Sequence, residues 1–379
     1  MSGIEPLDPA VPPPGVRARF VENVNGLRLH VLEAGFEADG RPLVILLHGF
    51  PELAYSWRKV LPALAAAGYH AVAPDQRGYG RTTGWSADYD SDLAPFRPFN
   101  LVRDVMGLVA ALGRSSAAAV VGHDFGALPA AWSALLRPDV FRKLVLLAVP
   151  FAGPPTLSAK VSAPSRDIHA DLAALPRPRK HYHWYYSTRE ANADMLHAPQ
   201  GLSAFLRAYY HQKSADWAGN RPAPLKGWTA EALATMPTYY VMDLHRTMAE
   251  TVAAEAPTPA EAAACGWLTE AELAVYAGEY ARTGFQGGLQ WYRCVTERVM
   301  IGEMELFSGR AVEVPALFLA GDADWCVRQT PGAFERMQGK GLADLRGVHI
   351  VPGAGHWVQQ EQPDAVNRLL LEFLGGTRG

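Results

Sequence analysis

The chain has 379 residues, of which 49% are hydrophobic and 19% charged, and its formal net charge at pH 7 is −3. This composition is that of an ordinary globular protein and excludes a largely disordered chain. The slightly negative charge and the lack of a basic stripe argue against nucleic acid as a partner. No apolar run approaches the ~20 residues that a membrane-spanning helix needs, so we expect no membrane insertion.

The cysteines and the first residues indicate the cellular compartment. Cys265, Cys294 and Cys326 are odd in number, scattered, and contain no C-x-x-C pair, which suits a reducing compartment. The first twenty residues lack a basic start followed by an apolar run, so they do not resemble a signal peptide. We therefore expect a cytoplasmic protein, and the sequence leaves its oligomeric state open.

The first part of the chain predicts alternating strands and helices. Two β-rich runs around Asn25-Gly26 predict a hairpin. From residue 42, continuous apolar runs, typical of strands buried on both faces of a parallel sheet, alternate with runs of helical spacing. The predicted strands span 42–49, 70–78, 117–124 and 143–150, and the predicted helices span 53–69, 101–113 and 125–138.

This alternation stops at about residue 151 and resumes near residue 301. Between them lie amphipathic stretches, one of which, 268–284, has a capping box of Thr269 and Glu272 and a Gly284 stop. We predict an α/β fold, a doubly wound and mostly parallel sheet with an inserted helical cap. The core spans 1–150 and 301–379, the cap spans 151–300, and the later core elements are strands over 314–322 and 347–356 and helices over 332–341 and 363–376.

The segment VVGHDFGA, residues 120–127, lies where a predicted strand meets a predicted helix. Gly122 and Gly126 flank Asp124, and small neighbours permit a strained turn with an exposed side chain. The aspartate is also a suitable N-cap for the following helix. A carboxylate with a pKa near 3.9 is ionised at neutral pH and attacks saturated carbon. Asp124 is therefore a candidate nucleophile.

Two further segments place titratable side chains after predicted strands. GDADW carries Asp322 and Asp324, and GAGHW carries His356. The carboxyl ends of parallel strands meet at one edge of the sheet, where open α/β sheets place their sites. The chain order of nucleophile, acid and histidine is that of a hydrolase triad. Either aspartate is close enough to the strand end to be the acid.

The segment HGFPE, residues 48–52, follows the strand predicted over 42–49. Its Phe50 N–H and the N–H of Phe125 are expected to form an oxyanion hole, since Pro51 has no N–H to donate. In DQRGYGRT, residues 75–82, Asp75 and Arg77 are expected to be structural.

The segment HYHWYYSTRE offers His181 and His183. We expect this segment to be helical, and residues two apart do not share a helix face. No cysteine or acid cluster accompanies them. We therefore predict no metal site.

The motifs HGFPE, DQRGYGRT, GHDFGA, GDADW and GAGHW together resemble those of the epoxide hydrolases of the α/β-hydrolase superfamily. The resemblance covers residues 20–150 and 310–370, and its G-x-x-D arrangement favours Asp324 over Asp322 as the acid. In the insertion, TGFQGGLQWYR is similar to the segment that carries one ring-opening tyrosine, here Tyr292. The second ring-opening tyrosine lies in HYHWYYSTRE, where the family spacing favours Tyr182 and leaves Tyr185 and Tyr186 as alternatives.

The resemblance implies a two-step reaction without a cofactor. Asp124 opens an epoxide and becomes an ester, while two tyrosine hydroxyls protonate the leaving oxygen. Water activated by His356 and Asp324 then hydrolyses the ester to release a diol. The expected partners are a small apolar epoxide and water. Four tryptophans beside the proposed catalytic residues suggest an aromatic substrate pocket or ordinary packing: Trp184, Trp291, Trp325 and Trp357.

Two other functions share part of this pattern. A haloalkane or haloacid dehalogenase shares the aspartate nucleophile, but here the next residue is Phe125, which offers neither an indole donor nor a guanidinium. A non-catalytic binding protein with this fold usually lacks part of the triad, and here each position holds a competent residue. The segment 214–265 is longer than a compact cap requires and has no predicted role.

Overall fold

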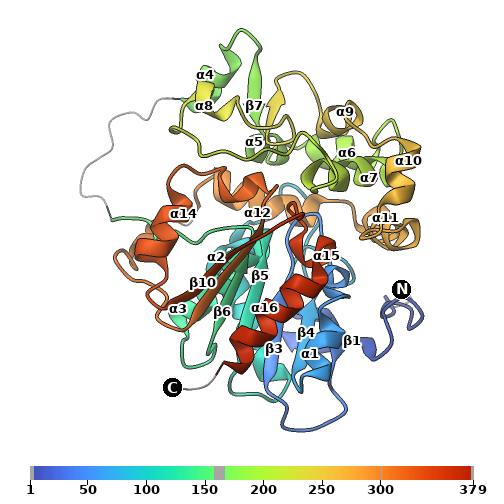
Figure 1. Cartoon of the computed structure of the whole chain (residues 1–379), viewed down its shortest axis with the longest axis vertical. Helices are drawn as coiled ribbons and strands as arrows, with labels where there is room; N and C mark the ends of the chain where they lie inside the picture. The colour runs from blue at the N-terminus through green and yellow to red at the C-terminus, as the bar shows by residue number, and fades with distance from the viewer. Residues whose placement is uncertain (1–3, 158–166, 300, 377–379) are drawn as a thin grey trace.

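A mixed sheet forms the base on which the rest of the chain is built (Figure 1). The structure, a computed structural model, describes residues 4–157, 167–299 and 301–376. The eight strands of this sheet follow the order β1-β2-β4-β3-β5-β6-β9-β10. Their bounds are β1 (Val16–Val24), β2 (Leu27–Ala34), β3 (Leu43–Leu47), β4 (His70–Pro74), β5 (Ala119–His123), β6 (Leu144–Leu147), β9 (Ala316–Gly321) and β10 (Leu345–Val351).

The strand pairing confirms the predicted doubly wound, mostly parallel sheet. β1 and β2 form an antiparallel hairpin, β2 pairs antiparallel with β4, and all later neighbours are parallel. The hairpin turns at Asn25 and Gly26, whose φ angles are 49° and 82°. Positive φ at both central residues is what a two-residue hairpin turn requires.

Alternate residues of the central strands face opposite sides of the sheet. In β3, Val44 and Leu46 belong to one hydrophobic cluster, and Leu43, Ile45 and Leu47 belong to the other. Both faces are covered, because α1 (Leu61–Ala66) and α16 (Pro363–Gly375) pack on the first, and α2 (Pro98–Ala111) and α3 (Ala127–Leu136) pack on the second. Burial on both faces explains the continuous apolar runs in the sequence.

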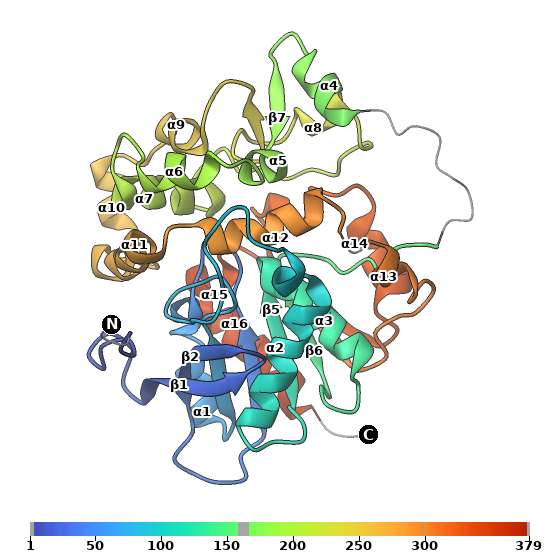
Figure 2. The same ribbon diagram turned by 180° about the vertical axis from the view of Figure 1, so that it is seen from behind.

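Most of the described chain between β6 and β9 lies over the carboxyl ends of the parallel strands (Figures 1 and 2). It is mostly helical, as predicted, but it also contains a small antiparallel sheet of two strands, β7 and β8. Its elements are α4 (Ile168–Ala173), β7 (Arg179–His181), α5 (Tyr182–Tyr186), α6 (Ala191–Leu196), α7 (Leu202–Lys213), α8 (Ala230–Leu233), β8 (Val241–Asp243), α9 (Met248–Ala253), α10 (Pro259–Ala264), α11 (Glu270–Thr283), α12 (Gln286–Thr296) and α13 (Ile301–Glu305).

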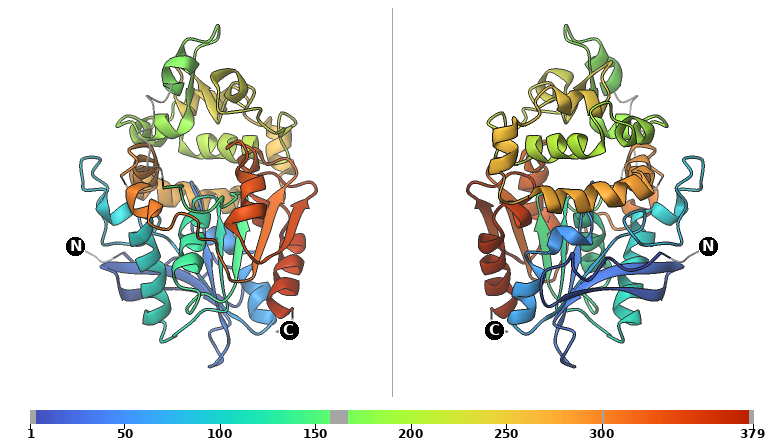
Figure 3. Two further views of the ribbon diagram at one scale, coloured as in Figure 1. Left: turned by 90° about the vertical axis from the view of Figure 1, so that its left-hand side faces the viewer. Right: turned by 90° about the vertical axis from the view of Figure 1, so that its right-hand side faces the viewer.

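Two features of this insertion matter for the site. The helix predicted over 268–284 is α11, with Thr269 and Glu272 in a capping box and Gly284 at its end with φ of 64°, which confirms the prediction. Figure 3 shows α12 lying between the sheet and the rest of the insertion.

The division at residues 150 and 300 stays a prediction, and residue 300 and residues 158–166 lie outside the described part of the chain.

Several predicted elements differ from the structure at their ends. The helix predicted over 53–69 is instead the 3-10 helix η1 (Ala54–Trp57) followed by α1, because Pro62 has no N–H to continue a helix. The strand predicted over 347–356 begins at Leu345 and ends at Val351, since Pro352 and Gly353, with φ of 68°, turn the chain.

The helix predicted over 332–341 is α14 (Ala333–Arg336) followed by the π-helix η5 (Met337–Gly341). The helical prediction for HYHWYY is wrong at its start, because His181 is the last residue of β7 and pairs with Val241. Among the described residues, the structure has no helix long and apolar enough to cross a membrane.

The contact between α12 and the loop after β4 predicts the effect of two glycine substitutions. A Cβ at Gly287 would overlap the carbonyl of Gly78, whereas a Cβ at Gly278 on α11 would meet nothing within 4 Å. We expect Gly287→Ala to lower the free energy of unfolding by about 1–3 kcal/mol. The control Gly278→Ala should raise it by about 0.5–1 kcal/mol, because alanine favours a helix interior.

Both free energies are measured by denaturant unfolding of the purified variants. Equal stability of the two variants would contradict a backbone contact between α12 and the Gly78 loop.

Candidate active site

The turn after β5 presents Asp124 at the carboxyl edge of the sheet. Asp124 begins the 3-10 helix η3 (Asp124–Gly126) and has a φ of 48°, an uncommon conformation for a residue with a side chain. The turn is tight, because a Cβ at Gly122 would overlap the carbonyl of Gly126, and a Cβ at Gly126 would overlap the carbonyl of Leu47. Glycines at these positions therefore permit the strained turn that the sequence predicted.

The carboxylate of Asp124 lies against the loop after β3. The Phe50 N–H donates a hydrogen bond to Oδ1 of Asp124 at 3.0 Å. Gly49 is required for this approach, since a Cβ there would overlap the Asp124 side chain. The predicted oxyanion donor Phe50 is thus in contact with the nucleophile itself. The N–H of Phe125, the second predicted donor, stays a prediction.

His356 lies between Asp124 and Asp324. Its Nε2 is 3.2 Å from Oδ2 of Asp124, and its Nδ1 is 3.2 Å from both carboxylate oxygens of Asp324. Among the described residues, Nε2 makes no hydrogen bond of good geometry in spite of this short contact. The nitrogen is therefore free to accept a proton from a water molecule beside Asp124.

The two candidate acids, Asp324 and Asp322, differ in burial and in their hydrogen-bond partners. Asp324 is 2% exposed, and it also accepts a hydrogen bond from the N–H of Cys326 at 2.8 Å. Asp322 is exposed and accepts a hydrogen bond from the N–H of Gly353 in the following turn. Of these two acids, only Asp324 contacts the imidazole of His356.

The charge of Asp124 is maintained by its neighbours. Burial alone would raise the pKa of the Asp124 carboxyl, but the close contact with His356, 3.2 Å away, outweighs it. The charges of Lys213 and His123 act in the same direction, so the pKa of Asp124 lies well below its ordinary value. The carboxylate is therefore ionised at neutral pH, as a nucleophile must be.

The predicted ring-opening tyrosines come from two helices of the insertion. Tyr292 lies on α12, and its ring packs edge-on against Phe125 with ring centres 4.5 Å apart. Tyr182 is the first residue of α5, and the ring centres of Tyr182 and Tyr292 are 5.9 Å apart. Burial raises the pKa of both hydroxyls well above the ordinary value, and the Asp124 charge adds to this effect. Both therefore stay protonated and able to donate.

The alternatives to Tyr182 differ in what their hydroxyls contact. The Tyr185 hydroxyl donates to Oδ2 of Asp194 at 3.0 Å, within the insertion. Tyr186 is fully buried and packs against Tyr292, and its hydroxyl has no hydrogen bond of good geometry among the described residues. The Tyr182 hydroxyl donates to Oε1 of Gln329 at 3.1 Å. The Tyr185 hydroxyl is thus bonded within the insertion, whereas the rings of Tyr182 and Tyr186 both pack against Tyr292.

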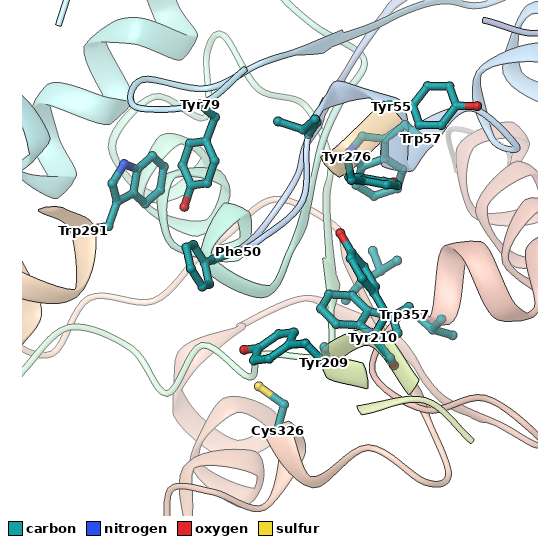
Figure 4. Packing of buried hydrophobic residues seen from close by; sticks show 14 of the residues in the cluster. Phe50, Tyr55, Trp57, Tyr79, Tyr209, Tyr210, Tyr276, Trp291, Cys326 and Trp357 are labelled. Atoms are coloured by element: carbon teal, nitrogen blue, oxygen red, sulfur yellow. The ribbon is translucent and has the colours of Figure 1, made fainter. Parts of the chain in front are cut away.

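The four tryptophans named in the sequence analysis differ in what their rings and indole N–H groups contact. Trp357 packs against the His356 ring at 4.7 Å and donates to the Tyr210 carbonyl, and Trp291 donates to the Arg77 carbonyl. Both indole N–H groups are thus used by the scaffold, and Figure 4 shows Trp357 against Tyr210 and Trp291 beside Tyr79.

The other two tryptophans are not tied to the scaffold in this way. Trp325 follows Asp324 directly, and its buried Nε1 has no hydrogen bond among the described residues. Trp184 packs against His169 and His181 instead of the triad.

A buried ion pair beneath the site was not predicted from the sequence. Glu52, the last residue of HGFPE, accepts hydrogen bonds from Gly49 N–H and from Nδ1 of His123, the residue before the nucleophile. Nε2 of His123 donates to the carbonyl of His356 at 2.8 Å. Burial would lower the pKa of His123, but the Glu52 charge raises it, so the pair is ionic.

This pair joins three loops of the site. The carboxylate Oε1 of Glu52 also accepts from the side chains of Gln359 and Gln360, each at 2.9 Å. The two motifs that contain Glu52 and His123 were visible in the sequence, but nothing in them indicated that the side chains meet.

A second unpredicted residue, Glu361, supports the turn that carries His356. Its carboxylate accepts hydrogen bonds from the N–H groups of Gly355, Trp357 and Ala215 at 2.8–2.9 Å. Ala215 lies just after α7, so Glu361 joins the insertion to the His356 turn. The segment 214–265, which had no predicted role, therefore begins at the active site.

Three side chains of the site could serve as metal ligands. Asp124, Cys326 and His356 place one ligand atom each within 4.8 Å of one another. Two of these residues already make the triad contacts, so a bound cation would break the triad. His181 and His183, the histidines weighed in the sequence, lie on different elements of the insertion.

Asp75 and Arg77 have structural contacts, as predicted. Asp75 accepts hydrogen bonds from Nδ1 of His30 and from the N–H groups of Ala54 and Arg81. Arg77 forms a buried ion pair with Asp104. Both residues hold loops that border the site.

Comparisons with known proteins identify the group to which the chain belongs. The family model for the alpha/beta hydrolase fold matches residues 42–363. Epoxide hydrolase B of Mycobacterium tuberculosis is 36% identical over 364 residues, which are 94% of this chain and 98% of that protein. Epoxide hydrolase A of the same organism is also 36% identical, over 96% of this chain and 98% of that protein.

A solved structure agrees with these relatives. The epoxide hydrolase from an endophytic Streptomyces matches with a TM-score of 0.75 at 34% identity, over 96% of each chain. The residues matched by the family model include the whole insertion and the positions of Asp124, Asp324 and His356. The chain belongs to the alpha/beta hydrolase fold family and, within it, to the epoxide hydrolases.

Proposed function

We propose that this protein hydrolyses epoxides to vicinal diols through an ester formed on Asp124. The observation that carries the proposal is the hydrogen bond from the Phe50 N–H to Oδ1 of Asp124. In a serine hydrolase an oxyanion hole holds the carbonyl oxygen of the substrate. Here the donor holds an oxygen of the nucleophile, which supports a reaction in which Asp124 itself becomes the acyl group that is hydrolysed.

In the first step, the free carboxylate oxygen of Asp124 attacks an epoxide carbon and the C–O bond of the ring breaks. The leaving oxygen needs a proton, and the hydroxyls of Tyr182 and Tyr292 are the proposed donors. Their raised pKa values keep both protonated before the reaction. The product of this step is an ester between Asp124 and the opened substrate.

In the second step, water attacks the side-chain carbonyl carbon of Asp124. His356 Nε2, 3.2 Å from the carboxylate, takes the proton from this water. Asp324 holds the imidazole through Nδ1 and offsets the positive charge that develops. The Phe50 N–H, with the Phe125 N–H as proposed second donor, stabilises the oxyanion. When this intermediate collapses, the departing alkoxide takes the proton of the added hydroxyl, so the diol leaves and the Asp124 carboxylate is restored. The proton held by His356 returns to the tyrosinate formed in the first step.

The same geometry argues against the competing functions. A dehalogenase must stabilise a departing halide with a donor, but Phe125 has none and the Trp291 N–H is bonded to the Arg77 carbonyl. A non-catalytic binding role does not account for a buried triad with an unbonded, buried Nε2 on His356. The remaining parts of the proposal are a small apolar epoxide body, no cofactor, and a cytoplasmic location.

Removal of the nucleophile is the direct test. We expect Asp124→Asn to lower the turnover of styrene oxide by about 10⁴-fold or more, because an amide oxygen does not displace an alkoxide. Diol formation is measured by chromatography. Asp322→Asn, just after β9 in the same sheet, is the matched control and should keep most of its activity. Diol formation at the wild-type rate by Asp124→Asn would refute the proposal.

Removal of the base should separate the two steps. We expect His356→Gln to form the ester but to hydrolyse it very slowly, because water is no longer activated. Intact-protein mass spectrometry after a short incubation should show a gain of one epoxide mass, and peptide mapping should assign it to Asp124. The Asp124→Asn/His356→Gln double variant should gain no mass. A gain in the double variant would mean that another residue is the nucleophile.

The choice of ring-opening donors is tested with phenylalanine variants. We expect Tyr182→Phe and Tyr292→Phe each to slow ester formation by about 100-fold, the lower end of the range for loss of a general acid, because one donor remains. Ester formation is followed by tryptophan fluorescence in single-turnover experiments. Tyr185→Phe is the control and should react at nearly the wild-type rate. A larger loss in Tyr186→Phe than in Tyr182→Phe would assign the second donor to Tyr186.

A further inference from the structure

The buried cation Lys213 helps to lower the pKa of Asp124, but its ammonium contacts no reacting atom in the two steps described above. Lys213 is the last residue of α7, and it is only 3% exposed. Its carbonyl accepts a hydrogen bond from the N–H of His356 at 2.8 Å. The lysine therefore belongs to the insertion but lies directly against the turn that carries the candidate base.

Aromatic rings enclose the ammonium group. Nζ lies 5.2 Å from the ring centre of Tyr240, 5.3 Å from that of Trp357 and 5.4 Å from that of Tyr209. The same rings contact reacting groups, since Trp357 packs on His356 and Tyr240 packs on Tyr182. The ammonium thus lies in the same enclosure as the triad, in which Figure 4 shows Tyr209 beside Cys326.

This ammonium is charged but has no acid as a direct partner. Burial would lower the pKa of Lys213, but Tyr209, Asp124 and other neighbours raise it. Asp124 and Asp324, the acids that influence it, direct their oxygens to other groups. Among the described residues, none has a carboxylate within 4.0 Å of Nζ, and the hydroxyl of Tyr209 is its neutral hydrogen-bond partner.

A buried ammonium group is energetically unfavourable unless an anion pairs with it. Burying an ammonium without an anionic partner costs several kcal/mol, and ring faces recover only part of that. An ammonium carries three N–H donors, so one hydroxyl leaves two of them without an acceptor. Aspartate, glutamate or another anion at hydrogen-bond distance would satisfy them, and the described residues supply none.

Other buried donors in the same region also lack acceptors. The hydroxyl of Tyr240 approaches the thiol of Cys326, a weak acceptor, but makes no hydrogen bond of good geometry among the described residues. The Nε1 of Trp325, next to Asp324, is buried without a hydrogen bond as well. Buried polar groups are normally paired. A surplus of donors around a cation indicates that the missing component is an acceptor with negative charge.

We propose that Lys213 binds a carboxylate of the substrate, so that the preferred substrates are epoxides that carry a carboxylic acid. The proposal rests on the epoxide hydrolysis proposed above and names its substrate class. A carboxylate accepts several hydrogen bonds at once, and a charge-assisted bond to an ammonium is stronger than a neutral one. The apolar remainder of the substrate would lie against the aromatic rings.

A different role for Lys213 predicts a different result. If its charge served only to balance Asp124 and Asp324, its loss would slow every epoxide by the same factor. If it binds a substrate carboxylate, its loss should slow epoxy acids far more than neutral epoxides of the same length. The ratio of the two substrate classes therefore separates the roles.

The experiment compares ω-epoxy acids of four to eight carbons with their primary amides at pH 7.5. For the best chain length we expect wild-type kcat/KM to favour the acid by about 10- to 100-fold, the range of a charge-assisted hydrogen bond. Lys213→Met should remove this preference, so that turnover of the acid falls at least tenfold further than turnover of the amide, and Lys213→Arg should retain part of the preference. Turnover of the amide shows that the variant is folded.

Lys180 provides a matched control. Its ammonium lies 4.8 Å from the ring centre of Tyr185 in the insertion, but it is only half buried. Lys180→Met removes the same charge from the same part of the chain, and it should keep the acid preference. The proposal is overturned if no acid exceeds its amide, or if Lys213→Met slows acid and amide equally.

A binding measurement keeps this inference separate from the proposed activity. Hexanoate and hexanamide have no epoxide, and their binding is followed by calorimetry with the wild type and Lys213→Met. We expect hexanoate to bind at least tenfold more tightly than hexanamide to the wild type only. If epoxides are not hydrolysed but this difference is found, the proposed activity fails and the anion site stands. If hexanoate and hexanamide bind alike, the anion site is refuted.

Discussion

The hydrogen bond between the Phe50 N–H and Oδ1 of Asp124 is the contact on which the site depends. It forms only because the loop after β3 and the turn after β5 approach each other without side chains at Gly49 and Gly126. The same approach holds Asp124 at a φ of 48°, where its second carboxylate oxygen faces His356. One donor thus fixes both the direction of attack and the carbonyl that water later attacks.

The second constraint on the site is the burial of several negative charges close together. Asp124, Asp324 and Glu52 are all buried carboxylates near the carboxyl edge of the sheet. Glu52 is paired with His123, and its hydrogen bonds tie together the loops that carry the donor, the nucleophile and the base. The two triad acids instead face His356, which must remain able to accept a proton. The ion pair of Glu52 and His123 therefore holds the loops together without using the side chains of the triad.

The sequence predicted the sheet, the order of the triad and the Phe50 donor because each depends on a short local pattern. Gly122 and Gly126 around Asp124, for example, indicate the turn without reference to the rest of the fold. The pairing of Glu52 with His123 could not be predicted in this way, since it joins residues 71 positions apart. The end of β10 at Val351 depended on a turn that apolar spacing alone did not reveal.

The insertion contacts the core at two places that local sequence patterns did not indicate. α12 rests on the core through the close backbone contact of Gly287 with Gly78, and α7 joins it through the carbonyl of Lys213 and the N–H of His356. Moving α7 away from the core would break the hydrogen bond that supports the base. Side chains between these two helices are therefore well placed to contact a substrate, and the buried Lys213 at the end of α7 is a charged residue among them.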